Sequence, residues 1–385
     1  MVGSDKIKIL HLVSDLGIGG VQKVVLDICS TADLDKYEVS VFLLKDDKEL
    51  LSTYSLSPKI IIRAFDYRYS ADYSLMGYMA HTLTKKIVAR RGVRIIEEAI
   101  KLSPDIIHLH IHPRELNLGI LIAQQTKSKL IYTEHLVRFT PASFSLNLLA
   151  KILRPIYRKY NLIAVSKSVL KEINEHRLCG KNKLLVLIEN KLNLTLLPPV
   201  QIKMANSITF VYVARIGHPK GHELLVKAWN NLPPSLNKKL LLVGPDELNN
   251  EIHELAKKLA LDKSIVFLGK QLNVANILSK ADIGVFPSYK EGLPISLLEK
   301  MAMELPVIVS NIPELTDVIQ HNVNGLTFRS GDVNDLTEKM LQLIDNPELR
   351  LQLGKAARRT VEERFGTTNI AFANEIIYEK VMKSS

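Results

Sequence analysis

Cysteine and long apolar runs are scarce in this sequence of 385 residues. Two cysteines, Cys29 and Cys179, are too few for a disulfide framework in a chain of this length and fit a reducing compartment. No apolar stretch approaches the roughly 20 residues that a transmembrane helix requires. The opening residues MVGSDKIKILHLVSD place charges before a strand-like run, so we expect neither a signal peptide nor a membrane span there. These absences predict a cytoplasmic protein.

Aromatic residues make up only 6% of the chain and are scattered, without a nucleic-acid motif. We therefore expect no nucleic-acid partner. The chain is too long for one ordinary core, and its 46% hydrophobic and 24% charged residues are typical of a globular protein of two domains.

The net charge of +11 lies almost wholly in the first half of the chain, where residues 1–200 hold 29 Lys and Arg against 19 Asp and Glu. Such a basic surface can meet an anionic membrane or an acidic substrate. Residues 85–101 predict an amphipathic helix whose polar side carries Arg90, Arg91 and Arg94. From the sequence, this side can be an ordinary solvated face or a membrane-facing one.

Strand-like apolar runs alternate with helical patterns along both halves, which predicts an α/β protein with parallel sheets. The first run, residues 7–13, is followed by the loop SDLGIGG and a helix. Gly19 and Gly20 in this loop would let the backbone approach a ligand. A tight turn without a ligand is an equally good interpretation of these glycines.

Four histidines lie on two predicted strands of the first half. Alternation places His108, His110 and His112 on one face of a strand, but residues along one strand diverge and no carboxylate or cysteine completes a ligand set. We therefore expect no metal there. His135 ends the next strand, 129–135, at the edge where open parallel sheets bind their ligands, which favours chemistry for this residue.

Charged residues of the second half stand where strands end and helices begin. Arg215 ends the strand 207–217 and Lys220 precedes a helix, so the two cations could neutralise a diphosphate. Within residues 281–328 a strand, a loop with Glu291 and a helix with Glu299 follow one another. Pro294 suits the start of that helix, whose free N–H groups would attract a phosphate. From spacing alone, however, surface charges are the better interpretation of the two glutamates.

With these parts in order, the sequence resembles the retaining nucleotide-sugar glycosyltransferases of family four, which have the GT-B fold. The E-x7-E motif of that family is similar to EGLPISLLE at 291–299, and KMAMELPVIVSNIPEL and VNGLTF follow it in the usual order. This resemblance overturns the surface interpretation of the glutamates. It implies two Rossmann-like domains facing each other across a cleft, 1–195 for the acceptor and 203–365 for the donor, with the C-terminal helix 366–385 crossing back to the first.

The resemblance also implies a role for each matching residue. Glu291 would lie against the donor sugar as a catalytic residue, and Glu299 would bind the ribose hydroxyls. Further donor-binding positions implied by the family are Arg215 and Lys220 at the diphosphate, Gly269 and Lys270 near the base, and Gly292, Leu293 and Pro294 with their backbone N–H groups. In the first domain, Gly19 and Gly20 would approach the phosphates or the acceptor, and His135 would match the active-site histidine.

The expected reaction is the transfer of a sugar, with retention of configuration, from a nucleotide diphosphate, with UDP-sugar favoured. It needs no metal and no cofactor, since the cations and the helix start can stabilise the leaving diphosphate. The expected acceptor is a glycan or a lipid-linked glycan for a cell-surface polysaccharide, which would bring the basic domain to the inner face of the cell membrane. The alternatives are a sugar-nucleotide epimerase of related fold and a non-catalytic nucleotide-sugar-binding protein.

The sequence departs from the family pattern in two places. Lys191 follows Asn190 where the family usually has glycine, and a lysine side chain resists the positive φ that glycine adopts easily. The spacing between Arg215 and Lys220 is short for the family, which makes the role of Lys220 the less certain of the two.

Overall fold

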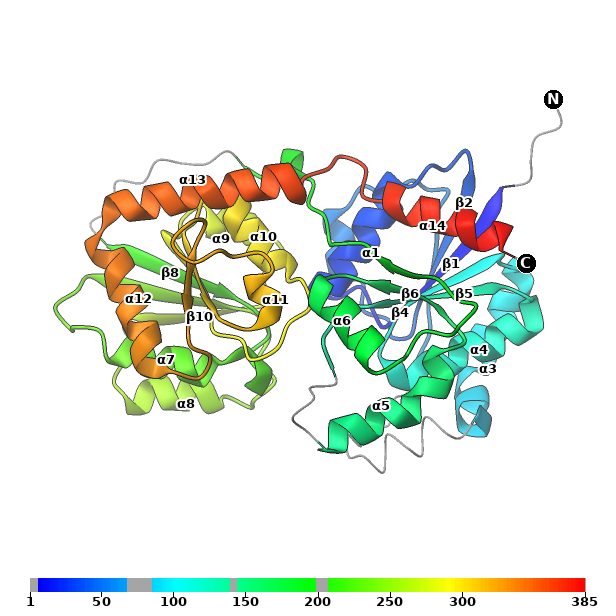
Figure 1. The fold of residues 1–385 in the computed structure, drawn as a ribbon, viewed down its shortest axis with the longest axis horizontal. Helices are drawn as coiled ribbons and strands as arrows, with labels where there is room; N and C mark the ends of the chain where they lie inside the picture. The colour runs from blue at the N-terminus through cyan, green and yellow to red at the C-terminus, as the bar shows by residue number, and fades with distance from the viewer. Residues whose placement is uncertain (1–5, 68–84, 139–143, 199–206, 385) are drawn as a thin grey trace. The chain divides into compact units, whose positions relative to one another are not determined.

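The computed structural model describes residues 6–67, 85–138, 144–198 and 207–384 (Figure 1). Contacts divide the chain into two compact units: unit 1 is Met1–Glu189 with Asn369–Ser385, and unit 2 is Asn190–Thr368. The domain limits 1–195 and 203–365 stay predictions. In the structure Asn190 and Leu192 pack in unit 2, where the Leu192 N–H donates to the carbonyl of Phe365 at 2.9 Å.

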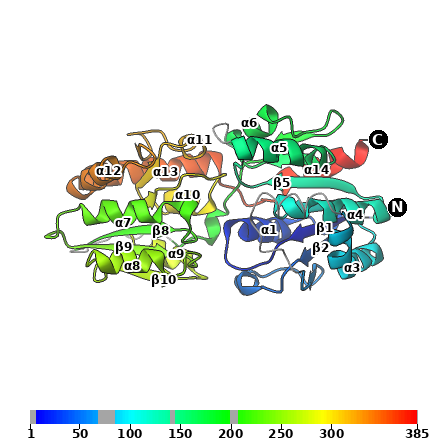
Figure 2. The same cartoon turned by 90° about the horizontal axis from the view of Figure 1, so that it is seen from below.

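The described part of unit 1 is built on a seven-stranded sheet whose strands all pair in parallel, in the order β3-β2-β1-β4-β5-β6-β7. Helices lie on both faces of it (Figure 2). The strands are β1 (Ile7–Val13), β2 (Tyr37–Leu43), β3 (Ile61–Ala64), β4 (Ile106–His110), β5 (Lys129–Glu134), β6 (Asn161–Ala164) and β7 (Leu185–Leu187). The helices are α1 (Gly20–Thr31), α3 (Lys85–Leu102), α4 (Leu116–Thr126), α5 (Phe144–Tyr157), α6 (Lys167–Glu175) and α14 (Phe372–Lys383).

Unit 2 holds, in its described residues, a six-stranded parallel sheet in the order β10-β9-β8-β11-β12-β13. Its strands are β8 (Ile208–Val213), β9 (Lys238–Val243), β10 (Ile265–Gly269), β11 (Ile283–Phe286), β12 (Val307–Ser310) and β13 (Leu326–Phe328). Its helices are α7 (His222–Asn230), α8 (Glu251–Lys258), α9 (Val274–Leu278), α10 (Ile295–Ala302), α11 (Pro313–Thr316), α12 (Val333–Asp345) and α13 (Pro347–Arg364). The predicted parallel α/β architecture is confirmed in both units.

The central strands are apolar because helices cover both faces of each sheet, which leaves few positions in contact with water. The last helix of the chain, α14, belongs to unit 1: Ile377, Tyr378 and Val381 are buried in the same core as β1 and β2. The prediction that the C-terminal helix packs on the first domain is therefore confirmed.

Each sheet has one point where the strand order reverses, between β1 and β4 in unit 1 and between β8 and β11 in unit 2. Loops that leave neighbouring strands there run to opposite sides and open a crevice beyond the carboxyl ends of the strands, where α/β proteins bind ligands. The loops of interest are therefore those after β1 and β4, and those after β8 and β11.

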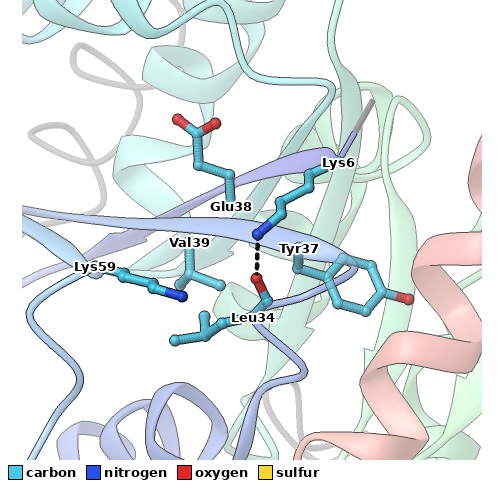
Figure 3. Close-up of a pocket in the computed structure, with 6 residues that line it drawn as sticks. All are labelled: Lys6, Leu34, Tyr37, Glu38, Val39 and Lys59. Carbon is cyan, nitrogen blue, oxygen red and sulfur yellow. Dashed lines mark hydrogen bonds between the residues drawn. The ribbon is translucent and has the colours of Figure 1, made fainter. Parts of the chain in front are cut away.

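A shallow pocket of unit 1 lies at the other end of the strands. It is lined by Lys6, Leu34, Tyr37, Glu38, Val39 and Lys59 (Figure 3). Lys6 precedes β1 and Tyr37 begins β2, so the pocket faces the amino ends of the strands. The Lys6 ammonium donates a hydrogen bond to the carbonyl of Leu34 at 2.6 Å. This pocket is not at the ligand edge of the sheet.

No helix among the described residues has both the length and the apolar character needed to cross a bilayer.

Candidate functional site

In unit 2, the loops after β8 and β11 meet through an ion pair. The Lys220 ammonium donates to both carboxylate oxygens of Glu291 at 2.8 Å. The Glu291 side chain is only 7% exposed and that of Lys220 18%, so the pair is largely withdrawn from water. The two residues are 71 apart in sequence, and the strand-order reversal between β8 and β11 brings them together.

Gly221 makes the approach of the two loops possible. Its φ is +69°, and a Cβ atom there would lie 2.1 Å from the carbonyl oxygen of Pro287, which follows β11. Only glycine fits this backbone without strain. The buried Tyr212 phenol adds a second link, since it donates to the Lys220 carbonyl at 2.8 Å and lies 2.9 Å from the Ser288 hydroxyl. Burial, with the charge of Glu291, raises the pKa of Tyr212, which stays a neutral donor.

The loop from Glu291 to Pro294 ends at the start of α10, as predicted. Pro294 is the N-cap residue, and Gly292 and Leu293 are buried. The amide of Asn190 donates to the Leu293 carbonyl at 2.7 Å and so fixes the loop from another element. Glu299 lies on α10 and is 8% exposed. Both glutamates of the motif are therefore buried, which the surface interpretation did not anticipate.

A buried lysine follows the second glutamate of the motif. Lys300 is 0% exposed, and its ammonium lies 4.3 Å from the ring centre of Phe286 and donates to the Ser296 carbonyl at 3.2 Å. Burial lowers the pKa of Lys300 to about 7, although the charges of Glu299 and Glu291 oppose this shift. The Lys300 amine therefore gains or loses its proton near neutral pH.

The remaining predicted donor residues of unit 2 lie apart from this pair. Arg215 is 58% exposed and donates to both oxygens of Glu247, at 2.7 and 2.9 Å, rather than joining Lys220 and Glu291. Gly269 ends β10 with φ of +61°, and among the described residues nothing beyond its chain neighbours lies within 4 Å of the place of a Cβ; Lys270 beside it is exposed. The structure therefore brings Lys220 to Glu291 but does not join Arg215 to them.

In unit 1, the glycine loop after β1 leads directly into α1. Gly19 is the N-cap residue and Gly20 the first residue of the helix. Apart from its chain neighbours and the backbone of α1 itself, no atom of the described residues lies within 4 Å of the place where the Cβ of Gly20 would stand. The loop is held by Asp15, which accepts from the Gly17 N–H at 3.1 Å and from the Gln22 amide at 2.9 Å. The backbone at Gly20 is thus open, and the approach of a ligand to it stays a prediction.

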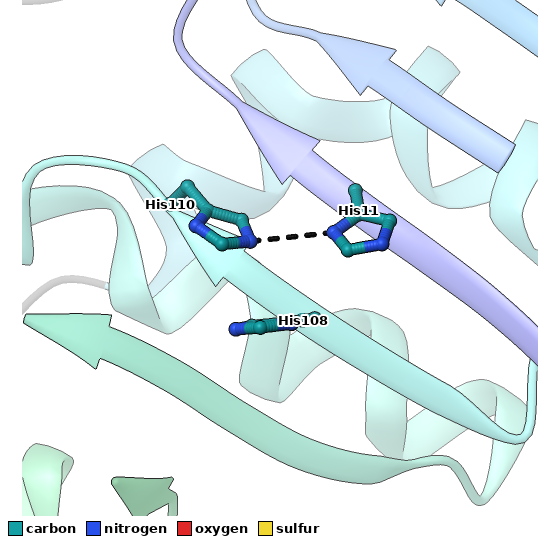
Figure 4. Close-up of side chains that lie close together, drawn as sticks. All are labelled: His11, His108 and His110. Atoms are coloured by element: carbon teal, nitrogen blue, oxygen red, sulfur yellow. Dashed lines mark hydrogen bonds between the residues drawn. The ribbon is translucent and has the colours of Figure 1, made fainter. Parts of the chain in front are cut away.

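His135, directly after β5, makes its hydrogen bond through Nε2 to Nδ1 of His110, at 3.1 Å. Nε2 of His110 lies 3.3 Å from Nδ1 of His11, on β1 (Figure 4). Burial lowers the pKa of His11 to about 4 and that of His135 to about 3, and the Arg138 charge adds to the second shift. These imidazoles are therefore neutral near pH 7.

By distance alone, three buried histidines could bind a metal ion, because one ligand atom from each lies within 4.8 Å of the others. They are His11, His108 and His110. The hydrogen bonds contradict this interpretation. The two nitrogens of His108 already lie 2.8 Å from the Tyr378 hydroxyl and 2.7 Å from that of Thr133. Both nitrogens of His110 are likewise engaged. His112 lies just beyond β4, and its Nδ1 accepts from the Arg114 N–H.

Several residues of these sites were missed in the sequence. His11 carries a usable signal, because it pairs in register with His108 on the neighbouring parallel strand and so shares its face of the sheet. Gly221 stands beside the predicted Lys220 and could have been noted. The sequence carries no signal for the roles of Tyr212 and Asn190, since their contacts depend on tertiary packing. Lys191 needs no positive φ, contrary to our concern, and donates to the Arg364 carbonyl at 2.7 Å.

Comparison with known proteins bears on both units. Residues 198–360 match the family described as glycosyl transferases group 1, and residues 18–187 match glycosyltransferase family 4. N-acetyl-alpha-D-glucosaminyl L-malate synthase of Bacillus anthracis is 28% identical over 300 residues, 75% of this chain and 78% of that protein. The capsular polysaccharide biosynthesis glycosyltransferase CapM of Staphylococcus aureus is 28% identical over 255 residues, 63% of this chain and 67% of its own length.

Solved structures agree in fold. HepE of Anabaena, in complex with UDP-glucose, superposes with a TM-score of 0.79 at 19% identity, covering 97% of this chain and 100% of its own. Sucrose-phosphate synthase of Thermosynechococcus elongatus gives 0.79 at 22% identity, covering 98% and 100%. The chain therefore belongs to glycosyltransferase family four and has the GT-B fold.

Proposed function

We propose that this glycosyltransferase moves a sugar, with retention of configuration, from a nucleotide diphosphate to a glycan or lipid-linked acceptor. The observation that carries the proposal is the Lys220–Glu291 pair, which is shielded from water at the strand-order reversal of unit 2, together with the burial of Glu299 on α10. UDP is the favoured carrier, because HepE, which shares the fold, has been solved with UDP and with UDP-glucose.

The proposal gives separate roles to Lys220, Glu299 and Arg215 of unit 2. As the bond between the anomeric carbon and the diphosphate breaks, negative charge develops on the leaving group. The Lys220 ammonium and the N–H groups at the start of α10 would stabilise that charge without a metal or a cofactor. Glu299 would accept hydrogen bonds from the ribose hydroxyls. Arg215 would leave Glu247 for the diphosphate, an exchange of one exposed ion pair for another that costs little.

Glu291 suits orientation of the sugar better than nucleophilic attack, because both its oxygens already accept hydrogen bonds from Lys220. Retention then arises by attack of the acceptor on the face that the diphosphate leaves, with the leaving phosphate taking the acceptor proton. His135 would contribute as a neutral hydrogen-bonding group, since its pKa is lowered to about 3.

The acceptor side follows from charge and from relatives. The excess of Lys and Arg in residues 1–200 favours an acceptor that is anionic or held at the inner face of a membrane, and CapM is named for capsular polysaccharide biosynthesis. We expect the protein to float with liposomes containing anionic lipid at low salt and to be released at high salt. If it stayed with the pellet at low salt, membrane contact would be contradicted.

A thermal-shift panel of nucleotide sugars tests the donor, because a ligand that binds only the folded state at 100 times its Kd adds about 2.7 kcal/mol of stability. We expect a UDP-sugar to give the largest shift, Glu299→Gln to abolish it, and Glu223→Gln, at an exposed position of the same unit, to preserve it. Transfer with EDTA present, and the anomeric configuration of the product by NMR, test metal independence and retention. Isomerisation of the donor without acceptor would show an epimerase instead.

A further inference from the structure

Three histidines form a continuous row of hydrogen bonds, which we name the imidazole chain: His11 on β1, His110 on β4 and His135 directly after β5. Nδ1 of His11 lies 3.3 Å from Nε2 of His110, and Nδ1 of His110 lies 3.1 Å from Nε2 of His135. His11 is 1% and His110 3% exposed, whereas His135 is half-buried. The chain thus leads from the interior of unit 1 to the carboxyl end of β5 (Figure 4 shows its inner pair).

The two contacts restrict where the protons of the chain reside. A neutral imidazole carries one N–H donor and one bare acceptor nitrogen. If His11 donates from Nδ1, then His110 must donate from Nδ1 in turn, and His135 carries its proton on Nδ1. If His135 donates from Nε2 instead, His110 and His11 both carry theirs on Nε2. The geometry therefore allows two sets of tautomers, in which all three residues are alike.

Burial keeps the chain in this neutral form. It lowers the pKa of His110 well below its ordinary value, and the neighbouring His108, His135 and His11 add to the shift. His108 lies beside the chain without belonging to it, because its own nitrogens lie within hydrogen-bond distance of the hydroxyls of Tyr378 and Thr133.

The loop that carries His135 is also held in place. Glu134, which precedes it, is 1% exposed and accepts from the Tyr157 hydroxyl at 2.6 Å and from Nε of Arg138 at 3.0 Å. The Arg138 N–H donates to both carboxylate oxygens of the buried Glu172, at 2.8 and 3.0 Å. Nε2 of His135 is engaged with Nδ1 of His110. Nδ1 is therefore the nitrogen of His135 that makes no hydrogen bond among the described residues.

We propose that His110 is a positioning residue for His135, and that the imidazole chain couples the choice of protonated nitrogen on His135 to that on His110 and His11. Through the two tautomer sets, Nδ1 of His135 is presented either as a donor to a sugar oxygen or as an acceptor from a hydroxyl. The role of Nδ1 toward a sugar rests on the proposed function, whereas the coupling of the tautomers does not.

Ring ¹⁵N chemical shifts of selectively labelled histidines test the coupling in the wild-type protein, with assignments from His11→Gln and His135→Gln. We expect His11, His110 and His135 to show the same tautomer, with or without UDP. Two different tautomers among the three would overturn the proposal. Stoichiometric zinc in the purified protein that is lost in His110→Phe would also overturn it, because a metal-bound nitrogen cannot share a proton.

Turnover of the fastest UDP-sugar among UDP-glucose, UDP-galactose and UDP-GlcNAc tests the positioning. We expect His110→Phe to lower kcat roughly tenfold or more, about 1.4 kcal/mol or more in the barrier, with little change in KM. His110→Asn, whose amide lies near the position of Nδ1, should recover part of the loss. Tyr378→Phe is the matched control, since it removes a buried hydrogen bond from His108, off the chain, and should keep kcat.

The outcomes separate the two proposals. Equal losses in His110→Phe and Tyr378→Phe would show a purely structural role and would contradict positioning. Failure of every UDP-sugar to turn over would contradict the proposed function, while the tautomers would still decide the coupling.

Discussion

Replacing Lys300 by methionine tests whether the burial of its amine lowers the free energy of unfolding of unit 2. Lys300 is fully buried, beneath Phe286 and over Gly284, whose Cβ would stand 2.6 Å from Cδ of the lysine. Methionine keeps an unbranched apolar stem of similar length and removes the charge. We expect Lys300→Met to raise the free energy of unfolding.

The size of the effect follows from linkage. Burial lowers the pKa of Lys300 from 10.5 to about 7 in the folded protein. Because the unfolded state binds the proton more tightly, the folded state bears the full cost below pH 7, and the cost falls as pH rises from 7 to 10.5. At about 1.4 kcal/mol per pKa unit, the cost is about 5 kcal/mol at pH 6 and about 2 kcal/mol at pH 9.

The sequence provides a convenient probe, since its single tryptophan, Trp229, is buried in α7 of unit 2. Urea unfolding followed by Trp229 emission should show Lys300→Met gaining about 2 to 3 kcal/mol more over the wild type at pH 6 than at pH 9. Lys227→Met, at an exposed position of the same helix as the probe, should show no such difference. A gain that does not depend on pH would refute the reasoning, because no buried titration would then be present.

Three further substitutions probe other parts of the fold. Lys220→Met removes the cation from the buried Glu291 and should lower kcat roughly 100-fold, as for the loss of one charge-stabilising donor, whereas a normal kcat would remove Lys220 from the mechanism. Gly221→Ala should cost at least about 2 kcal/mol by Trp229 emission, because φ is +69° and the Pro287 carbonyl oxygen would clash with the new Cβ. Gly217→Ala is its control in the same unit, since φ there is −154° and a Cβ would make only ordinary contacts. Ile377→Ala should destabilise unit 1 by about 2 to 5 kcal/mol by hydrogen exchange of β1 and β2, and unchanged exchange would exclude α14 from their core.

The sequence allowed the architecture to be predicted because the apolar runs and helical patterns alternate clearly in both halves. The start of α10 at Pro294 was also predictable, since the constraint is local and chemical. The positions of single side chains were less so. From the sequence, Lys220 and Arg215 were both assigned to the diphosphate, with the role of Lys220 the less certain. In the structure Lys220 pairs with buried Glu291, whereas Arg215 pairs with exposed Glu247.

The histidines show the same limit more clearly. Alternation correctly placed His108 and His110 on one face of β4, but a strand considered alone has no third partner. The imidazole chain requires β1 and β5 on either side of β4, which depends on strand order. That order is a tertiary property, so His11 entered the site only when the sheet was known. Arg90 and Arg91, which we assigned to a basic helix face, have side chains outside the described residues.

The position of α14 also has a consequence for biosynthesis. Unit 1 is made of two stretches, and its second, Asn369–Ser385, is translated only after all of unit 2. At about 5 to 20 residues per second, the ribosome adds the intervening residues in roughly 10 to 40 s. During that time the nascent unit 1 lacks Tyr378, so His108 has no phenol beside it and the apolar surface under α14 is uncovered. The half that is synthesised first is therefore the half that completes its folding last, and it is the one that a chaperone would have to protect.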